Sequence, residues 1–277
     1  MNVADDHLAA GVVNRVPMQV MGILNVTPDS FSDGGQWFAP QAAIAHGIEM
    51  FAQGAHVVDV GGESTRPGAE VVPLAEELRR VVAVIEALAV HGTVSIDTMK
   101  RQVALASVSA GASIINDVSA SLFQTAAECG VGWIAMHMQG SPRSMQLDPH
   151  YDDVVGEVSA FLAQQVERAD AAGVAKVWID PGIGFGKTLE NNVALLHALA
   201  MLGGIAPVML GVSRKSFLGK LGQGAEGADR DRASAELASW AATQHVAMVR
   251  VHDVAGTVAA LRSPPPIAAP PWLGTAV

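Results

Sequence analysis

The chain has 277 residues and half of them are hydrophobic, so it can bury a sizeable core, either in two small domains or in one large α/β domain. Its 17 basic and 27 acidic side chains give a formal net charge of −10, which argues against a nucleic-acid-binding protein but not against an anionic small substrate held by local basic groups. The single Cys129 excludes an internal disulfide framework and is typical of a reducing compartment. The first residues lack a signal peptide and the apolar runs are too short to span a bilayer, so we expect a cytoplasmic protein that binds neither membrane nor nucleic acid.

Short apolar runs alternate with segments of helical spacing along the chain. The strand-like runs begin near residues 18, 56, 93, 112, 132, 176, 207 and 246. The helical segments are about 41–53, 74–89, 100–110, 123–128, 152–172, 191–202, 233–244 and 255–261. Because no change of composition divides these eight repeats, they predict one (β/α)₈ TIM barrel over residues 18–262. A doubly wound open sheet is the alternative, but the dinucleotide signature of that fold is absent.

The two ends of the chain lie outside this pattern. We expect residues 1–17 to form a loose leader. Residues 263–277 are rich in proline, which has no backbone N–H to donate, so we expect a mobile, non-helical tail there.

A polar residue ends nearly every predicted strand. These residues are Asn25, Asp59, Asp97, Asn116, His137, Asp180, Lys215 and His252. In a parallel barrel the carboxyl ends of all strands meet at one face, where barrel enzymes place their chemistry. The pattern therefore predicts an active site at the C-terminal ends of the strands.

Three of these residues have short side chains with fixed donor and acceptor directions, namely Asp97, Asn116 and Asp180. They suit a flat heterocycle with amide and ring-nitrogen edges. Asp180 opens the glycine-rich stretch 180–188, whose glycines let the backbone lie close to such a ligand. The stretch is not a phosphate-binding P-loop, because only three residues separate Gly182 from Gly186 where that motif needs four.

Basic residues at the same face indicate an anionic group on the substrate. Arg66, Lys215, Arg250 and His252 could gather anionic oxygens. Asn25 could offer its carbonyl oxygen to a magnesium ion, which often binds through substrate phosphates with few protein ligands.

Eight segments together resemble the dihydropteroate synthase family. They are residues 25–35, 59–68, 95–98, 116–119, 136–140, 180–188, 213–219 and 250–253, and they occur in the family order. The resemblance covers about residues 18–262. It implies a (β/α)₈ transferase, usually a homodimer, that acts in folate biosynthesis and is a sulfonamide target. Members join 6-hydroxymethyl-7,8-dihydropterin pyrophosphate to p-aminobenzoate with magnesium, giving 7,8-dihydropteroate and pyrophosphate.

The resemblance also implies roles for individual residues. The pterin would be held by Asp97, Asn116, Met136, Asp180, Phe185, Gly211 and Lys215. The pyrophosphate would meet Asn25, Arg250 and His252, with Asn25 also binding magnesium. The p-aminobenzoate pocket would consist of Phe31, Thr65, Arg66, Pro67 and Ser216. The catalytic set would be Asp97, Asp180, Lys215, Arg250 and His252.

Two alternatives remain open from the sequence. A pterin-binding module for methyl transfer resembles this barrel and shares its pterin residues, but it needs neither a pyrophosphate site nor aminobenzoate loops. Arg66 and the segments 213–215 and 250–252 favour the synthase. A low-activity synthase paralogue is the other alternative.

The segment between Asp117 and His137 is shorter than usual in the family, so we expect a short fourth helix. His137 shows no obvious partner, and the role of Lys187 stays open.

Overall fold

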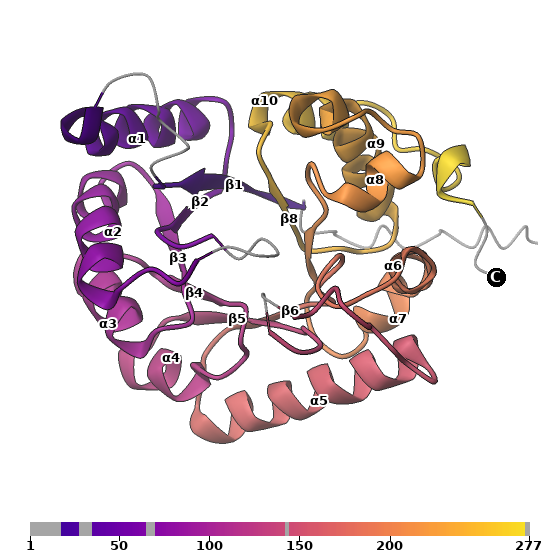
Figure 1. Ribbon diagram of the computed structural model, residues 1–277, viewed down its shortest axis with the longest axis horizontal. Helices are drawn as coiled ribbons and strands as arrows, with labels where there is room; N and C mark the ends of the chain where they lie inside the picture. The colour runs from indigo at the N-terminus through magenta and orange to yellow at the C-terminus, as the bar shows by residue number, and fades with distance from the viewer. Residues whose placement is uncertain (1–17, 28–34, 65–69, 142–143, 275–277) are drawn as a thin grey trace, which may run out of the picture.

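The computed structural model describes residues 18–27, 35–64, 70–141 and 144–274, with the side chains of residues 35–39 left out. Eight parallel strands surround a centre and helices cover them from outside (Figure 1). The strands are β1 (Gln19–Asn25), β2 (Val57–Gly61), β3 (Thr93–Asp97), β4 (Ile114–Asp117), β5 (Gly132–Met136), β6 (Val177–Asp180), β7 (Met209–Gly211) and β8 (Met248–Val251). The predicted TIM barrel is therefore confirmed.

The helices follow the strands in the expected alternation. They are α1 (Gly35–Ala52), α2 (Leu74–Ala89), α3 (Arg101–Ser109), α4 (Phe123–Cys129), α5 (Val154–Ala172), α6 (Leu189–His197), α7 (Leu199–Leu202), α8 (Ser216–Lys220), α9 (Asp231–Thr243) and α10 (Val254–Arg262). The expected short fourth helix is α4, which ends at Cys129 and is capped by Gly130 in the left-handed conformation. The single helix predicted over residues 191–202 is instead two, α6 and α7, and α8 was not predicted.

The strand order is β6-β5-β4-β3-β2-β1-β8-β7, with every neighbour parallel. The barrel closes between β6 and β7, where one isolated bridge joins Ile179 to Val208 and the Ile179 N–H donates to Pro207 O at 3.0 Å. This seam between β6 and β7 is the place where the ladder is shortest.

Strand residues two apart point to the same side of a sheet, which sorts the barrel interior into layers. One layer is a compact apolar cluster of Met21, Val57, Ile114, Ile134, Trp178, Met209 and Met248. Polar residues stand two positions later on several of these strands, as Asp59 does after Val57 and Asp180 after Trp178. The apolar layer therefore fills the lower barrel and leaves the polar layer at the carboxyl ends.

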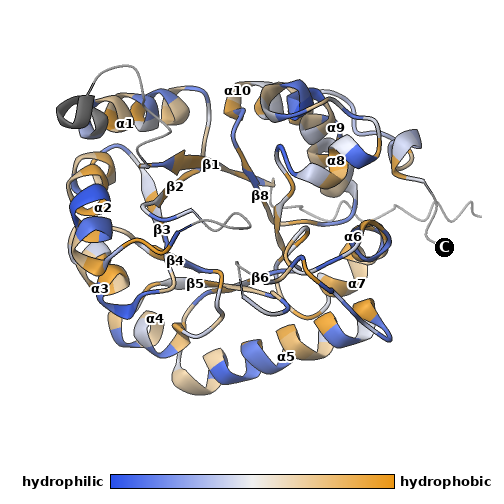
Figure 2. Cartoon of the chain, in the orientation of Figure 1, coloured by the Kyte–Doolittle hydropathy of each residue, from blue (hydrophilic) through white to orange (hydrophobic). Residues whose placement is uncertain are grey.

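A second, larger core lies between the sheet and the helices. Helix α5 illustrates the pattern, because Val158, Leu162 and Ala169 are buried on one of its faces. Blue and orange segments accordingly alternate along α5 in Figure 2. Within the described ranges, none of the helices is long and apolar enough to cross a membrane.

The expected non-helical tail is confirmed for residues 263–270 but not for the three residues that follow. Residues Pro271–Leu273 form one 3₁₀ turn, with Pro271 at a position where the missing N–H costs nothing. Leu273 is buried in the outer core, and the Trp272 indole N–H donates to Glu236 at 3.1 Å. Apolar burial therefore docks the tail on the barrel. The leader, residues 1–17, lies outside the described residues.

Candidate active site

The carboxyl ends of the strands carry a cluster of charged side chains built around Arg250. Arg250 lies in β8. Its guanidinium donates from Nε to Asp59 Oδ2 at 2.6 Å and from Nη2 to Asp97 Oδ2 at 2.7 Å. Asn116 Nδ2 donates to the same Asp59 oxygen at 2.9 Å. Residues from β2, β3, β4 and β8, up to 191 positions apart, are thus joined in one network.

Burial sets the electrostatics of this cluster. Asp59 is fully buried and Asp97 and Asn116 are nearly so. Burial raises the pKa of Asp97 to about 7, although the positive charge of Arg250 opposes the rise. Burial also disfavours the charged form of Arg250, but Asp59 and Asp97 outweigh it and raise the pKa of the guanidinium. Arg250 therefore stays charged and fixes both carboxylates.

Asp180 ends β6 and is held by the loop that follows it. Its Oδ1 accepts from the Gly182 N–H at 2.8 Å. Burial raises the pKa of Asp180, while Lys215 and the Gly182 N–H work against the rise. Gly182 has φ +67°, and a Cβ there would lie 1.8 Å from the His137 carbonyl oxygen. Only glycine fits this close approach. The sharp turn that directs the Gly182 N–H toward Asp180 therefore requires glycine at position 182.

Lys215 faces Asp180 across Gly211. A Cβ on Gly211 would lie 3.6 Å from Asp180 Oδ2 and 3.8 Å from Lys215 Nζ, so the glycine leaves room for both groups. Lys215 Nζ donates to Ile183 O at 2.5 Å and lies 4.6 Å from the centre of the Phe185 ring, a cation–π distance. Burial lowers the pKa of Lys215 to about 8, although Asp180 opposes this.

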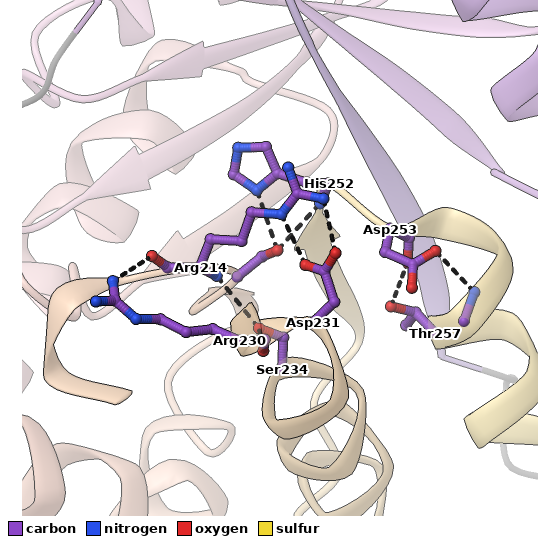
Figure 3. Close-up of polar contacts among 9 residues, drawn as sticks. Arg214, Arg230, Asp231, Ser234, His252, Asp253 and Thr257 are labelled. Atoms are coloured by element: carbon purple, nitrogen blue, oxygen red, sulfur yellow. Dashed lines mark hydrogen bonds and ion pairs between the residues drawn. The ribbon is translucent and has the colours of Figure 1, made fainter. Parts of the chain in front are cut away.

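His252 follows β8 and is oriented by Ser213, which follows β7. The Ser213 hydroxyl accepts from the His252 backbone N–H at 3.1 Å and contacts the imidazole Nδ1 at 3.0 Å. Arg214 turns away to α9, where its guanidinium binds both oxygens of Asp231 at 2.7 Å (Figure 3). The Arg214 N–H also donates to Ser234 Oγ at 3.2 Å. The 213–215 turn is thus braced from outside, and Arg214 does not take part in the site.

The structure brings most of the predicted site residues to one place. Asn25 ends β1 close to Asp97, because a Cβ on Gly61 would lie 3.6 Å from both Asn25 Oδ1 and Asp97 Cβ. Met136 is buried at the end of β5, and Ser216 is exposed at the start of α8. Phe31, Thr65, Arg66 and Pro67 lie outside the described residues.

Three contacts were not foreseen from the sequence. The sequence places Asp59 among the polar strand ends but predicts no binding role for it. A carboxylate in the middle of the buried strand β2 nevertheless requires a partner. His137, which had no evident partner, lies 3.0 Å from Lys187 Nζ through its Nδ1. Glu63 accepts from the Val72 N–H at 3.0 Å and also pairs with Lys100.

Comparison with known proteins places this geometry in a family. The family described as pterin binding enzyme matches residues 21–252. Dihydropteroate synthase of Mycobacterium leprae is 48% identical over 266 residues, covering 90% of this chain and 93% of that protein. The Yersinia pestis dihydropteroate synthase, solved with a sulfonamide drug, superimposes with a TM-score of 0.82 at 45% identity, covering 88% and 92% of the two chains. The Xanthomonas albilineans enzyme, solved with 7,8-dihydropteroate, gives 0.78 at 43% identity over 88% and 91%. With its polar cluster at the barrel mouth and this identity along most of its length, the chain belongs to the dihydropteroate synthase family of pterin-binding enzymes.

Proposed function

We propose that the chain condenses 6-hydroxymethyl-7,8-dihydropterin pyrophosphate with p-aminobenzoate, giving 7,8-dihydropteroate and pyrophosphate. The observation that carries the proposal is the buried network of Asp59, Asp97, Asn116 and Arg250 facing Asp180 and Lys215. This network places carboxylate and carboxamide groups in fixed directions at the carboxyl ends of the barrel strands. The Xanthomonas relative, which is solved with the reaction product, supports the same assignment.

The pterin half of the substrate fits the short acidic side chains. Asp97 and Asp180 can accept hydrogen bonds from its amino and ring N–H groups, and such bonds to charged acceptors contribute about 1.5–3 kcal/mol each. Asp59 fixes the Asn116 carboxamide by accepting from its Nδ2, so that the amide is oriented before the ligand arrives. The Phe185 ring, whose centre lies 4.6 Å from Lys215 Nζ, can cover a flat ring there.

The reaction is a substitution at the pterin methylene carbon. The carbon–oxygen bond to pyrophosphate breaks and its electron pair leaves with the oxygen, while the aromatic amine forms a carbon–nitrogen bond and releases one proton. Positive charge that develops on the pterin is stabilised by the neighbouring carboxylates Asp97 and Asp180. Negative charge that develops on the leaving group meets Arg250 and His252. No side chain of the chain has to become covalently attached.

Magnesium is also part of the proposal. Among the described residues there is no group of three His, Cys, Asp or Glu side chains that could hold a metal ion. The Asn25 carboxamide at the end of β1 is a single oxygen ligand, which fits an ion that arrives on the substrate phosphates and keeps most of its ligands there. Bound in this way, magnesium would neutralise charge on the leaving pyrophosphate.

A homodimer in the cytoplasm completes the proposal. The homodimer rests on the family resemblance and the compartment on the single Cys129, which is typical of a reducing environment. Each point has a direct measurement. Analytical ultracentrifugation of the purified chain gives its mass in solution. Cell fractionation with an antibody to the chain gives its compartment.

The proposed reaction is tested by pyrophosphate release. Purified protein is incubated with magnesium and with the pterin substrate, p-aminobenzoate, or both. Release that requires both substrates and yields dihydropteroate is the expected result. Binding of a reduced folate without any pyrophosphate release would instead indicate a pterin-binding module for methyl transfer, and very slow release would indicate a low-activity paralogue.

A further inference from the structure

A buried lysine lies beneath the glycine-rich loop that follows β6. Only 3% of Lys187 is exposed. Its Nζ lies 3.0 Å from His137 Nδ1 and 3.0 Å from the Phe185 carbonyl oxygen. The carbonyl oxygen of His137 is a further, longer contact at 3.5 Å. One ammonium group thus joins the end of β5 to the loop 181–186.

The chemistry of the contact between Lys187 and His137 determines which group donates the hydrogen bond. An ammonium group can only donate, so His137 must present an unprotonated Nδ1 to Lys187. Burial, reinforced by the charge of Lys187, lowers the pKa of His137 to about 3, which keeps the imidazole neutral. Burial lowers the pKa of Lys187 to about 7, with Asp180 favouring its charged form and Lys215 opposing it. The centre of the Tyr151 ring lies 5.9 Å from Nζ.

The pair is held rigidly by its own surroundings. The His137 ring packs edge-on against Phe161 with 5.0 Å between ring centres. Tyr151 donates from its hydroxyl to the Gly186 carbonyl at 2.8 Å, and Asn192 accepts from the Gly184 N–H at 2.7 Å. The loop is therefore held from outside by the neutral groups of Tyr151 and Asn192, on the site side by Asp180 and Lys215, and from beneath by Lys187.

Everything that this loop presents to the site depends on its conformation. Phe185 donates no side-chain hydrogen bond, so its ring position follows from its backbone, whose carbonyl is held by Lys187. The Gly182 N–H that binds Asp180 sits where the loop is pressed against the His137 carbonyl. We propose that Lys187 and His137 form a positioning pair that sets the 181–186 loop so that Phe185 and Asp180 engage the pterin half of the substrate.

This inference rests on the proposed function, because it assigns the pair to the pterin half. Lys187→Met removes the ammonium and keeps the aliphatic stem. It should raise the KM for the pterin substrate and weaken pterin binding in calorimetry at least tenfold. The KM for p-aminobenzoate, measured at saturating pterin substrate, should change less than twofold. Lys176→Met, an exposed lysine at the opposite end of β6, is the matched control and should leave both constants unchanged.

A second pair of variants keeps the test valid if Lys187→Met does not fold. His137→Asn retains an acceptor for Lys187 and should keep pterin binding within about threefold, whereas His137→Phe removes it and should lose at least tenfold. Pterin binding by Lys187→Met or His137→Phe equal to that of the parent overturns the inference and leaves the proposed function intact. A parent protein that binds no pterin refutes the proposed function and, with it, this assignment.

Discussion

Replacing Asp59 by Asn tests whether the buried carboxylate organises the site. The substitution keeps the shape of the side chain but removes the charge that accepts from Arg250 Nε at 2.6 Å and from Asn116 at 2.9 Å. Removing one member of a buried ion pair costs about 3–5 kcal/mol. Arg250 keeps Asp97 as a partner and its side chain is 19% exposed, so we expect the lower end, about 3 kcal/mol. For a domain of this size that corresponds to a fall in melting temperature of roughly 6–12 °C.

Two measurements follow this variant. Thermal unfolding gives the loss of stability, and calorimetry with the pterin gives the loss of affinity that results from a displaced Asn116 and Arg250. Asp152→Asn is the matched control, because the Asp152 side chain is 99% exposed and its ion pair among the described residues is with the exposed His150. If Asp59→Asn melted within 1 °C of the parent and bound pterin equally well, the carboxylate would not be the centre of the network.

Four further predictions concern the same face of the barrel. Asp180→Ala should preserve the fold in a melting curve but weaken pterin binding in calorimetry by about 1.5–3 kcal/mol, and unchanged affinity would contradict its role as an acceptor. Because the Asp97 carboxylate protonates below about pH 7 and Lys215 loses its charge above about pH 8, kcat/KM for the pterin substrate should be highest between these values, and a flat profile over pH 6–9 would oppose this. Gly182→Ala places a Cβ against a carbonyl oxygen at positive φ and should cost about 1–3 kcal/mol in urea unfolding together with most of the activity, whereas parental activity would show that the turn can relax. Arg66→Ala should raise the KM for p-aminobenzoate with little change in pterin binding. Labelled p-aminobenzoate should bind the parent only after the pterin pyrophosphate, or with magnesium, pterin and free pyrophosphate together; equal binding to the free protein would indicate a preformed pocket.

The sequence was sufficient for the barrel and for the face that carries the site. Apolar runs followed by helical spacing located every strand to within two residues at its start, because the alternation is local. Asp97, Asn116 and Asp180 were recognised as site residues because they end buried strands. Each of these conclusions depends on a few neighbouring positions in the chain.

Contacts across the barrel could not be obtained in the same way. The ion pair between Asp59 and Arg250 joins residues 191 positions apart, and it exists only because β8 pairs with β1 and β1 with β2. The contact between His137 and Lys187 depends on how closely the loop after β6 approaches β5. Periodicity shows which way a side chain points, but its partner depends on strand register and on the path of a loop.

The short ladder between β6 and β7 is the weakest joint in the ring of strands that carries the substrate-binding face. Continuous ladders link the strands of Asp59, Asp97, Asn116, Arg250 and Asp180. Asp180 at the end of β6 and Lys215, which follows β7, lie on opposite sides of the seam, where one bridge joins Ile179 to Val208. Local opening begins where few backbone hydrogen bonds hold a structure together. Amide hydrogen exchange should therefore be faster around residues 207–211 than in β1 to β3. A ligand that contacts Asp180 and Lys215 together would bridge the seam, and slower exchange at 207–211 would report its binding.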